Sequence, residues 1–408
     1  MSAGGAARRR PLDGVRVLDC GTFIAAPYCA TFLAEFGAEV VKVEMPGTGD
    51  PTRRFGTPTS CGDSLVWLSE SRNKKSVTID LKKPEGAELL RRLAEKADVL
   101  VENFQPGTLE KWGLGWEVLR ARNPRLVMVR ISAYGQTGPY SPRPGFGRIA
   151  NAFGGISFLA GDPDRPPVTP GSATLPDYLS GMYGAMGALM ALRERDRSGA
   201  GQVVDIGLYE SVFRILDELA PAFQHSGTIR QRMGPGTVNV VPHSHYPTKD
   251  GRWIAIACTS DKIFARLAEA MGHPEWAGEG RWGTLARREA ERAQVDAAVA
   301  EWTARHDRDA LLDLCSRGEV PCGPLYAIDE IFSDPQYAAR QNIAFVAEPR
   351  LPGAPPLALP NVVPRLEATP GRIDSAGPAL GAHTDAVLRD WIGLAPGEID
   401  DLRRSGAI

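Results

Sequence analysis

The sequence predicts an α/β protein in which a large sheet of parallel strands is joined to a smaller α+β domain. Three observations support this fold class. Short apolar runs such as Val15–Asp19 and Asp98–Glu102 alternate with amphipathic helices, which is the pattern of βαβ units. The chain changes character near His225, where a hairpin and several helices follow over about 226–330. Its 408 residues suffice for two domains.

The first βαβ unit is the clearest. Val15–Asp19 reads as a strand, Tyr28–Phe36 as a helix, and Ala38–Glu44 as the next strand, parallel to the first. The intervening turn, Gly21–Pro27, lacks the GxGxxG spacing of a nicotinamide-binding loop. The sequence therefore predicts the sheet without predicting a dinucleotide.

The following elements repeat this alternation. The pattern predicts strands at Ser76–Ile79, Asp98–Glu102, Leu126–Ile131 and Gln202–Ile206, and helices at Pro84–Lys96, Trp116–Arg122, Tyr178 to about Arg195, and Tyr209 to about Gln224. In the smaller domain it predicts a hairpin of His245–Pro247 and Trp253–Cys258, and helices at Lys262–Met271, Arg287–Arg305 and Arg308–Arg317. The stretch 335–400 is proline-rich and extended, with one helix at Thr384–Ile392.

A single carboxylate, Asp177, follows a proline at the start of the helix that begins near Tyr178. An aspartate at this place stabilises a helix as an N-cap, and a catalytic carboxylate is the other interpretation. Small residues recur along the helix at Gly181, Gly184 and Ala188, so we expect another backbone to pack closely against it.

Two basic segments and several strand ends could form a nucleotide site. Gly47–Arg54 and Ser71–Ser76 carry cations that either hold phosphate groups or form a solvated charge run. Asn103–Phe104 and Ser132–Tyr134 follow predicted parallel strands, whose carboxyl ends meet at the ligand-binding edge of such sheets. An aromatic ring and an amide beside basic loops would suit a purine and its phosphates.

Composition excludes several classes of protein. Net charge is −2, which does not indicate a nucleic-acid-binding protein, and no apolar run approaches the length of a membrane span. Residues 1–10 lack the apolar core of a secretory signal and are expected to form a flexible tail. Six scattered cysteines fit reduced thiols in the cytoplasm. His243 and His245 lack further metal ligands nearby, so we expect no metal.

The sequence contains seven short motifs in this order: Pro11–Asp19, Gly37–Glu44, Gly47–Asp50, Arg72–Ser76, Val101–Gly107, Tyr134–Pro139 and Gly381–Asp385. Together they resemble the class III CoA-transferases, or CaiB/BaiF family. This family includes formyl-CoA transferase, carnitine CoA-transferase and α-methylacyl-CoA racemase. The resemblance covers about residues 11–408.

The resemblance implies a Rossmann-like large domain built from residues 11–225 and 331–408, and a small domain at 226–330. It also implies a cytoplasmic homodimer whose two subunits interlock. Coenzyme A enters as part of the substrates, with no permanently bound cofactor.

The resemblance also implies a site in which Asp177 is the nucleophile. The turn at Ile24 and Ala25 would face the thioester. Positions that match the family's CoA contacts, together with cations from the two basic segments, complete the expected site: Arg53, Arg72, Lys75, Ile79, Asp80, Leu81, Lys82, Asn103, Phe104, Lys111, Ser132, Ala133, Tyr134 and Gly135.

The implied mechanism forms a mixed anhydride and then a CoA thioester on Asp177. An acyl-CoA epimerase and an inactive acyl-CoA-binding protein are the alternatives. The racemase branch has a histidine where this chain has Phe146, which argues against the epimerase, because proton shuttling needs a second base. His243 or His245 stays open as a substitute.

Departures from the family bear on the substrate. Ile24 replaces the glutamine of formyl-CoA transferase, so neither oxalate nor formate is the expected substrate. The side chains expected to face the pocket, Phe23, Ile24, Tyr28 and Phe146, predict a larger acyl group. Arg148 and Arg232 are candidate partners for a dicarboxylate, and Arg53 or Arg54 could replace an adenosine-contacting arginine missing at Met45.

Overall fold

The computed structural model describes residues 9–169, 171 and 174–408. The chain separates into two compact units, which we describe one at a time. The large unit comprises the described parts of Met1–Ile156, Gly171–Glu218 and Ala338–Ile408, and the small unit comprises those of Ser157–Pro170 and Leu219–Tyr337.

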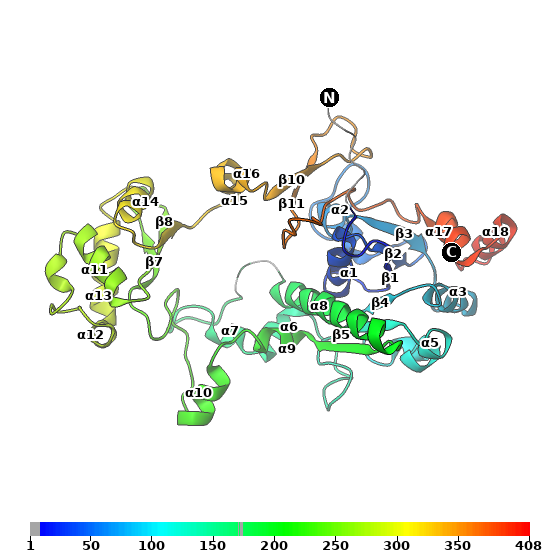
Figure 1. Cartoon of the computed structure of the whole chain (residues 1–408), viewed down its shortest axis with the longest axis horizontal. Coiled ribbons are helices and arrows are strands. Elements are labelled where there is room, and N and C mark those ends of the chain that lie inside the picture. Colours follow the sequence, from blue (N-terminus) through cyan, green and yellow to red (C-terminus); the bar gives the residue numbers. More distant parts are fainter. Residues whose placement is uncertain (1–8, 170, 172–173) are drawn as a thin grey trace. The chain divides into compact units, whose positions relative to one another are not determined.

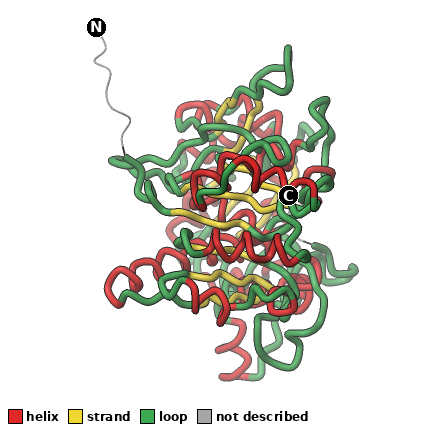
Figure 2. Tube along the Cα trace, turned by 90° about the vertical axis from the view of Figure 1, so that its right-hand side faces the viewer, coloured by secondary structure: helices red, strands yellow, loops and turns green. Residues whose placement is uncertain are grey.

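The large unit contains a six-stranded sheet with the order β3-β2-β1-β4-β5-β6. Figure 1 labels its strands β1 to β5, and Figure 2 draws the strands in yellow among the helices. All five neighbouring pairs are parallel, which confirms the predicted fold class. The strands are β1 Arg16–Asp19, β2 Glu39–Glu44, β3 Lys74–Thr78, β4 Val99–Glu102, β5 Val127–Ser132 and β6 Val203–Gly207.

Two hydrophobic cores lie on opposite faces of this sheet. Helices α1 (Ala25–Glu35) and α8 (Leu175–Ser198) cover one face, where Val17, Val99 and Val129 are buried. Helices α3 (Pro84–Ala94) and α17 (Thr384–Ile392) contribute to the core on the other face. Because both faces are covered, the central strands β4 and β5 are buried along their whole length.

Helix α8 packs against α1 through its small residues, as the glycine stripe predicts. A Cβ atom added to Gly181 would lie 2.8 Å from the carbonyl oxygen of Ala25, and one added to Gly184 would lie 3.2 Å from Cys29 Sγ. The helix backbones can approach this closely only because those positions carry no side chain. The contact fixes the N-terminal half of α8, where Asp177 lies.

The remaining elements of the large unit are short. They are η1 Pro51–Arg54, α2 Leu65–Glu70, α4 Thr108–Lys111, α5 Trp116–Arg122, α6 Gly147–Phe153, α9 Leu208–Phe213, α18 Pro396–Arg404 and an antiparallel hairpin of β10 Ile343–Val346 with β11 Leu357–Pro360. Two further helices, α7 Ile156–Leu159 and α16 Pro335–Ala339, span the points where the chain changes unit.

The small unit is an antiparallel sheet with helices. Strand β8 (Trp253–Ala257) pairs with β7 (His243–Pro247) and with β9 (Cys322–Pro324). Tyr246, Ile254 and Ile256 enter a core shared with the surrounding helices. The helices are α10 Leu219–Ser226, α11 Asp261–Ala270, η2 Pro274–Trp276, α12 Leu285–Ala290, α13 Arg292–Thr303, α14 Arg308–Arg317 and α15 Ile328–Ser333.

The structure corrects three details of the predicted elements. The helix expected over 209–224 is broken near Asp217, which has a φ of 39°, and the helix expected over 287–305 is divided at Glu291. Helix α8 begins at Leu175 instead of Tyr178, because a proline fits its first turn. Its N-cap is Thr174, so the interpretation of Asp177 as the N-cap is wrong.

Most of the predicted N-terminal tail, residues 1–8, lies outside the described residues. Its last residue, Arg10, forms ion pairs with Asp13 and Asp374. No helix in the described part of the chain is long and apolar enough to cross a membrane.

Replacing Gly181 by alanine tests the packing of α1 on α8. Alanine favours an isolated helix by about 1 kcal/mol, but here its methyl group would press against the Ala25 carbonyl, so we expect a lower melting temperature. Gly397→Ala in α18 is the control, because nothing lies within 4 Å of the added atom, and its melting temperature should be unchanged or slightly higher. Equal or higher stability of Gly181→Ala would contradict the close contact.

Candidate active site

A pocket of about 290 Å³ lies at the carboxyl ends of β1, β2, β3 and β4. This is the edge at which open parallel sheets bind ligands. Four residues predicted to contact CoA line it: Ile79, Leu81, Lys82 and Phe104. The remaining lining residues are Cys20, Thr22, Val43, Glu44, Met45, Gly49, Asp50 and Trp112. Met45, which stands where an adenosine-contacting arginine was expected, therefore lies at the pocket.

Polar and aromatic contacts shape the two ends of this pocket. The amide of Asn103 accepts a hydrogen bond from Thr22 N at 2.7 Å and donates one to Thr22 O at 2.8 Å. Asn103 therefore holds the turn after β1. Phe104 packs edge-on against Trp112, with ring centroids 5.2 Å apart, and leaves an aromatic wall on the pocket.

Two other predicted CoA contacts lie close by. Asp80 accepts a hydrogen bond from Lys82 N at 3.0 Å and fixes the loop that follows β3. The same loop is held by a bond from Asp80 N to Ala407 O at 2.8 Å. Lys111 is exposed at the end of α4, one residue before the pocket-lining Trp112.

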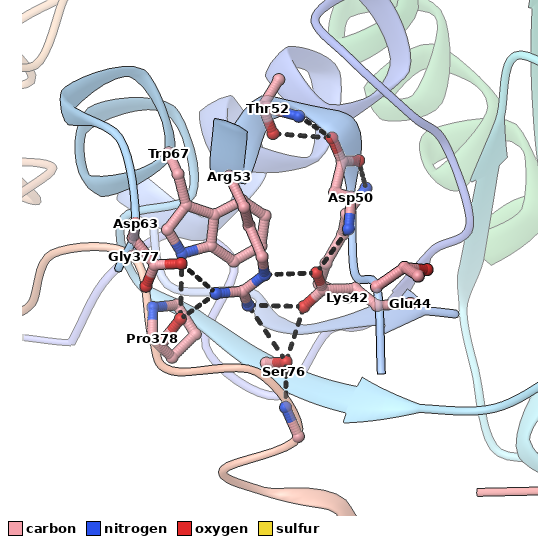
Figure 3. A network of polar contacts seen from close by, with 12 residues as sticks. Lys42, Glu44, Asp50, Thr52, Arg53, Asp63, Trp67, Ser76, Gly377 and Pro378 are labelled. Carbon is pink, nitrogen blue, oxygen red and sulfur yellow. Dashed lines mark hydrogen bonds and ion pairs between the residues drawn. The ribbon is translucent and has the colours of Figure 1, made fainter. Parts of the chain in front are cut away.

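Arg53 lies in a buried polar network (Figure 3). Its guanidinium bonds Glu44 at 2.7 and 2.8 Å and Asp63 at 2.8 Å, and it stacks over Trp67 at 3.6 Å from the ring centroid. The network engages Nε, Nη1 and Nη2 of Arg53 inside the fold, which argues against the predicted contact of Arg53 with CoA. The exposed Arg54 donates to the carbonyl of Thr48.

The cations of the segment 71–76 also pair with carboxylates. Arg72 is buried and bonds Glu35 at 2.7 Å, and Lys75 forms an ion pair with Glu39. Lys74, which is fully enclosed, donates to Asp19 at 2.8 Å. The three cations of this segment therefore bond carboxylates that lie on other elements. Sequence could not reveal the acidic partners because they lie on other elements.

Asp177 lies in the first turn of α8, half-buried, where the helix dipole favours negative charge. Thr174 Oγ1 donates a hydrogen bond to Asp177 Oδ2. The same oxygen faces Gly147, the first residue of α6, where an added Cβ would be only 2.1 Å away. Burial raises the pKa of the Asp177 carboxyl, and the hydrogen bond from Thr174 opposes that rise.

Aromatic residues connect the surroundings of Asp177 with the turn after β1. Phe146, next to Gly147, packs edge-on against Phe23, with centroids 6.1 Å apart, and Phe23 packs similarly against Phe55. Phe146 is 68% exposed. Tyr28 packs on Tyr178 with centroids 4.8 Å apart.

The turn after β1 is tightly held. Phe23 has a φ of 59°, a left-handed conformation that costs free energy in a non-glycine residue. Its amide donates to Asp50 Oδ1 at 3.3 Å. Ile24 is the N-cap of α1 and Ala25 its first residue, and both side chains are buried. The turn thus carries two of the predicted site residues on a fixed backbone.

The predicted residues 132–135 follow β5. Ser132 is buried, and its Oγ finds no hydrogen-bond partner among the described residues. Tyr134 belongs to an aromatic cluster with Tyr140, Phe153 and Tyr209. Ala133 faces Gly145, where an added Cβ would be 2.7 Å from its methyl group, and Gly135 has a φ of 82°.

Other candidates belong to the small unit. Arg232 donates to the carbonyl oxygens of Phe158 and Asp162, while His243 and His245 lie on β7. Arg148, in the large unit, is exposed next to Gly147. Among residues 9–169, 171 and 174–408, no group of three histidine, cysteine or acidic side chains could hold a metal ion.

Sequence reasoning missed two residues beside Asp177. Thr174 and Gly147 both contact its carboxylate. The spacing of Thr174, three residues before Asp177, was the available signal, but the usual meaning of that spacing is helix capping. Nothing in the sequence indicated Gly147, because its contact crosses between two helices.

The chain matches known proteins over nearly its whole length. The model of CoA-transferase family III matches residues 12–384. The chain is 52% identical to the beta subunit of succinyl-CoA–L-malate CoA-transferase from Chloroflexus aurantiacus, over 98% of both chains. It is 48% identical to a succinyl-CoA–D-citramalate CoA-transferase from the same organism, again over 98% of both.

A solved structure has the same fold. A CaiB/BaiF family protein from Brucella suis superposes with a TM-score of 0.83 and 33% sequence identity, covering 94% of this chain and 100% of that one.

Replacing Lys82 by alanine tests the pocket at the strand ends. An ammonium group beside a phosphate contributes roughly 1.4 kcal/mol, so we expect the Kd for CoA, measured by calorimetry, to rise about tenfold. Lys96→Ala is the control, because Lys96 is exposed before β4, at the opposite edge of the sheet. Equal Kd values for both variants would place CoA elsewhere.

Proposed function

This chain belongs to CoA-transferase family III, and on that basis we propose that it transfers CoA from succinyl-CoA to a hydroxydicarboxylic acid of the malate type. It is a CoA-transferase, and its relatives act between acyl-CoA thioesters and carboxylates. Substrates, nucleophile and intermediates are the proposed parts.

The observation that carries the substrate class is the 52% identity to a succinyl-CoA–L-malate CoA-transferase subunit over 98% of both chains. A second relative, at 48%, acts on D-citramalate, which is also a hydroxydicarboxylate. A succinate–glutarate enzyme, whose acceptor lacks the hydroxyl, is only 34% identical. Sequence identity is thus higher to the relatives whose acceptor carries a hydroxyl group, which favours a hydroxylated acceptor.

In the first proposed step, an oxygen of Asp177 attacks the carbonyl carbon of succinyl-CoA. A C–O bond forms, the C–S bond breaks, and the electron pair leaves with sulfur as CoA thiolate. The product is a mixed anhydride between Asp177 and succinate. Ile24 and Ala25 belong to the turn that would bind the thioester, and their backbone N–H groups are candidates to stabilise its oxyanion.

In the second step, CoA thiolate attacks the aspartyl carbon of the anhydride. A C–S bond forms, the anhydride C–O bond breaks, and succinate leaves as a carboxylate. The acceptor carboxylate then attacks the aspartyl thioester and releases thiolate again. Attack of this thiolate on the acceptor acyl carbon completes the new acyl-CoA and regenerates Asp177.

Three features support Asp177 as the nucleophile. It is half-buried, so anhydride and thioester intermediates would be shielded from water. It lies in the first turn of α8, which favours the carboxylate form and offsets the effect of burial. Gly147 accommodates the carboxylate, because a Cβ atom at that position would collide with Asp177 Oδ2. A carboxylate also keeps the acyl group activated, since its anhydride and thioester stay reactive toward the next nucleophile.

The epimerase is less well supported. Its proton shuttle needs a second base, and Phe146 occupies the place where the racemase branch carries histidine. We further propose that the protein forms an interlocked homodimer in the cytoplasm, with large and small domains divided near residues 225 and 330.

The acceptor can be tested directly. With succinyl-CoA as donor, we expect kcat/KM for L-malate or citramalate to exceed that for glutarate by about tenfold or more, because a site that bonds the hydroxyl discriminates against its absence. Mass spectrometry of the acyl-CoA products gives the rates, and acetate is the control. A preference for glutarate or acetate would overturn the proposed substrate class.

Replacing Asp177 by alanine tests the nucleophile. Turnover should fall at least about 1,000-fold while the Kd for CoA stays the same, because the predicted CoA contacts are other side chains. Borohydride added during turnover should reduce an adduct on Asp177 of the native chain to the alcohol, which peptide mass spectrometry detects. Asp196→Ala, exposed near the other end of α8, is the control. Retained turnover in Asp177→Ala would exclude this nucleophile.

A further inference from the structure

Thr174 occupies the N-cap position of α8, yet its side chain makes no capping hydrogen bond. An N-cap hydroxyl ordinarily accepts a bond from the backbone N–H of the second or third helical residue. Here the hydroxyl instead donates to Asp177 Oδ2. The threonine therefore serves the carboxylate and not the helix.

The local sequence explains why. Pro176 lies in the first turn of α8 and has no N–H to offer a cap. The N–H of Asp177 bonds the backbone carbonyl of Thr174 at 3.2 Å. With one possible capping donor missing and the other engaged by the backbone, the hydroxyl of Thr174 is left to the Asp177 side chain.

Gly147 fixes the same pair from the other side. A Cβ atom added there would lie 2.1 Å from Asp177 Oδ2 and 2.5 Å from Thr174 Oγ1. Oδ2 and the hydroxyl thus fill the space over a buried glycine. This arrangement distinguishes the two carboxylate oxygens, since Oδ2 accepts the hydrogen bond from Thr174 and lies against Gly147.

We propose that Thr174 is a catalytic residue that stabilises the negative charge that develops on Asp177 Oδ2 when the aspartyl carbonyl is attacked. This inference rests on the proposed function. Oδ1 is then the attacking oxygen and becomes the bridging oxygen of the anhydride, and Oδ2 becomes the aspartyl carbonyl oxygen.

Such a donor would assist two of the proposed steps, the attack of thiolate on the anhydride and the attack of the acceptor carboxylate on the aspartyl thioester. As thiolate sulfur bonds to the aspartyl carbon, the C=O pair moves onto Oδ2 and makes it an oxyanion. When the pair returns, the C–O bond to succinate breaks and succinate leaves. The acceptor carboxylate generates the same oxyanion when it expels thiolate. A hydroxyl already aimed at Oδ2 lowers both barriers without reorganisation.

The test replaces Thr174 by valine, which keeps the shape, and by serine, which keeps the hydroxyl. We expect kcat of Thr174→Val to fall roughly 100-fold, with the Kd for CoA and the melting temperature unchanged because no cap is lost. Thr174→Ser should stay within about threefold of the native kcat. Native kcat in Thr174→Val, or an equal loss in both variants, would overturn the proposal.

A pH profile separates this role from a purely structural one. Because the hydroxyl lowers the pKa of Asp177 and burial raises it, removing the hydroxyl should raise this pKa further. The nucleophile must be ionised, so the acid limb of kcat/KM should move to higher pH in Thr174→Val and return in Thr174→Ser. An unmoved limb would count against the hydrogen bond in solution.

Two variants separate the role of Asp177 as nucleophile from the role of Thr174 as hydrogen-bond donor. If Asp177→Ala keeps its activity, the nucleophile is wrong and Thr174 has no carbonyl to serve. If Asp177→Ala is inactive while Thr174→Val turns over normally, only the role of Thr174 is lost. In single-turnover reactions with succinyl-CoA, Thr174→Val should form the CoA adduct on Asp177 more slowly than the native chain.

Discussion

The site depends on buried charges beneath the turn that follows β1. Lys42 contacts Asp50 at 2.9 Å and bonds the carbonyl of Gly21, while Lys74 bonds Asp19 at 2.8 Å and the carbonyl of Pro27 at 2.7 Å. Burial alone would raise the pKa of Asp50, but Lys42 and the bonds from Thr52 hold it below its usual value. Removing any one of these charged side chains would leave another buried charge uncompensated, so the stability of each depends on the others.

The backbone of the turn connects these ionic contacts to the candidate site. Asp50 also accepts the bond from the amide of Phe23, whose left-handed conformation needs such support. The turn then continues into α1, which packs against α8 so closely that a glycine is required at position 181. The pocket at the strand ends and the carboxylate of Asp177 are therefore both built against one rigid segment, although the residues that form them come from distant parts of the chain.

The alternation of strands and helices was predictable because burial on both faces of the sheet leaves continuous apolar runs such as Leu126–Val129. Pocket residues Ile79, Leu81, Lys82 and Phe104 were predicted from family resemblance. The ion-pair partners of Arg53 and Arg72 were not predictable, because a basic segment has the same sequence pattern whether it binds phosphates or distant carboxylates. The position of Gly147 under Asp177 arises only from tertiary packing.

The order in which the ribosome makes the chain has a consequence for the sheet edge. Strand β3 lies at one edge of its sheet, and residues synthesised after the entire small unit complete its surroundings. Gly381 N donates to Ser76 Oγ at 2.8 Å, and Pro378 O accepts a hydrogen bond from Arg53. Until those residues emerge, β3 keeps an unpaired edge beside charges that lack part of their partners. We expect the nascent chain to be most prone to aggregation in that interval, and chaperones to matter most then.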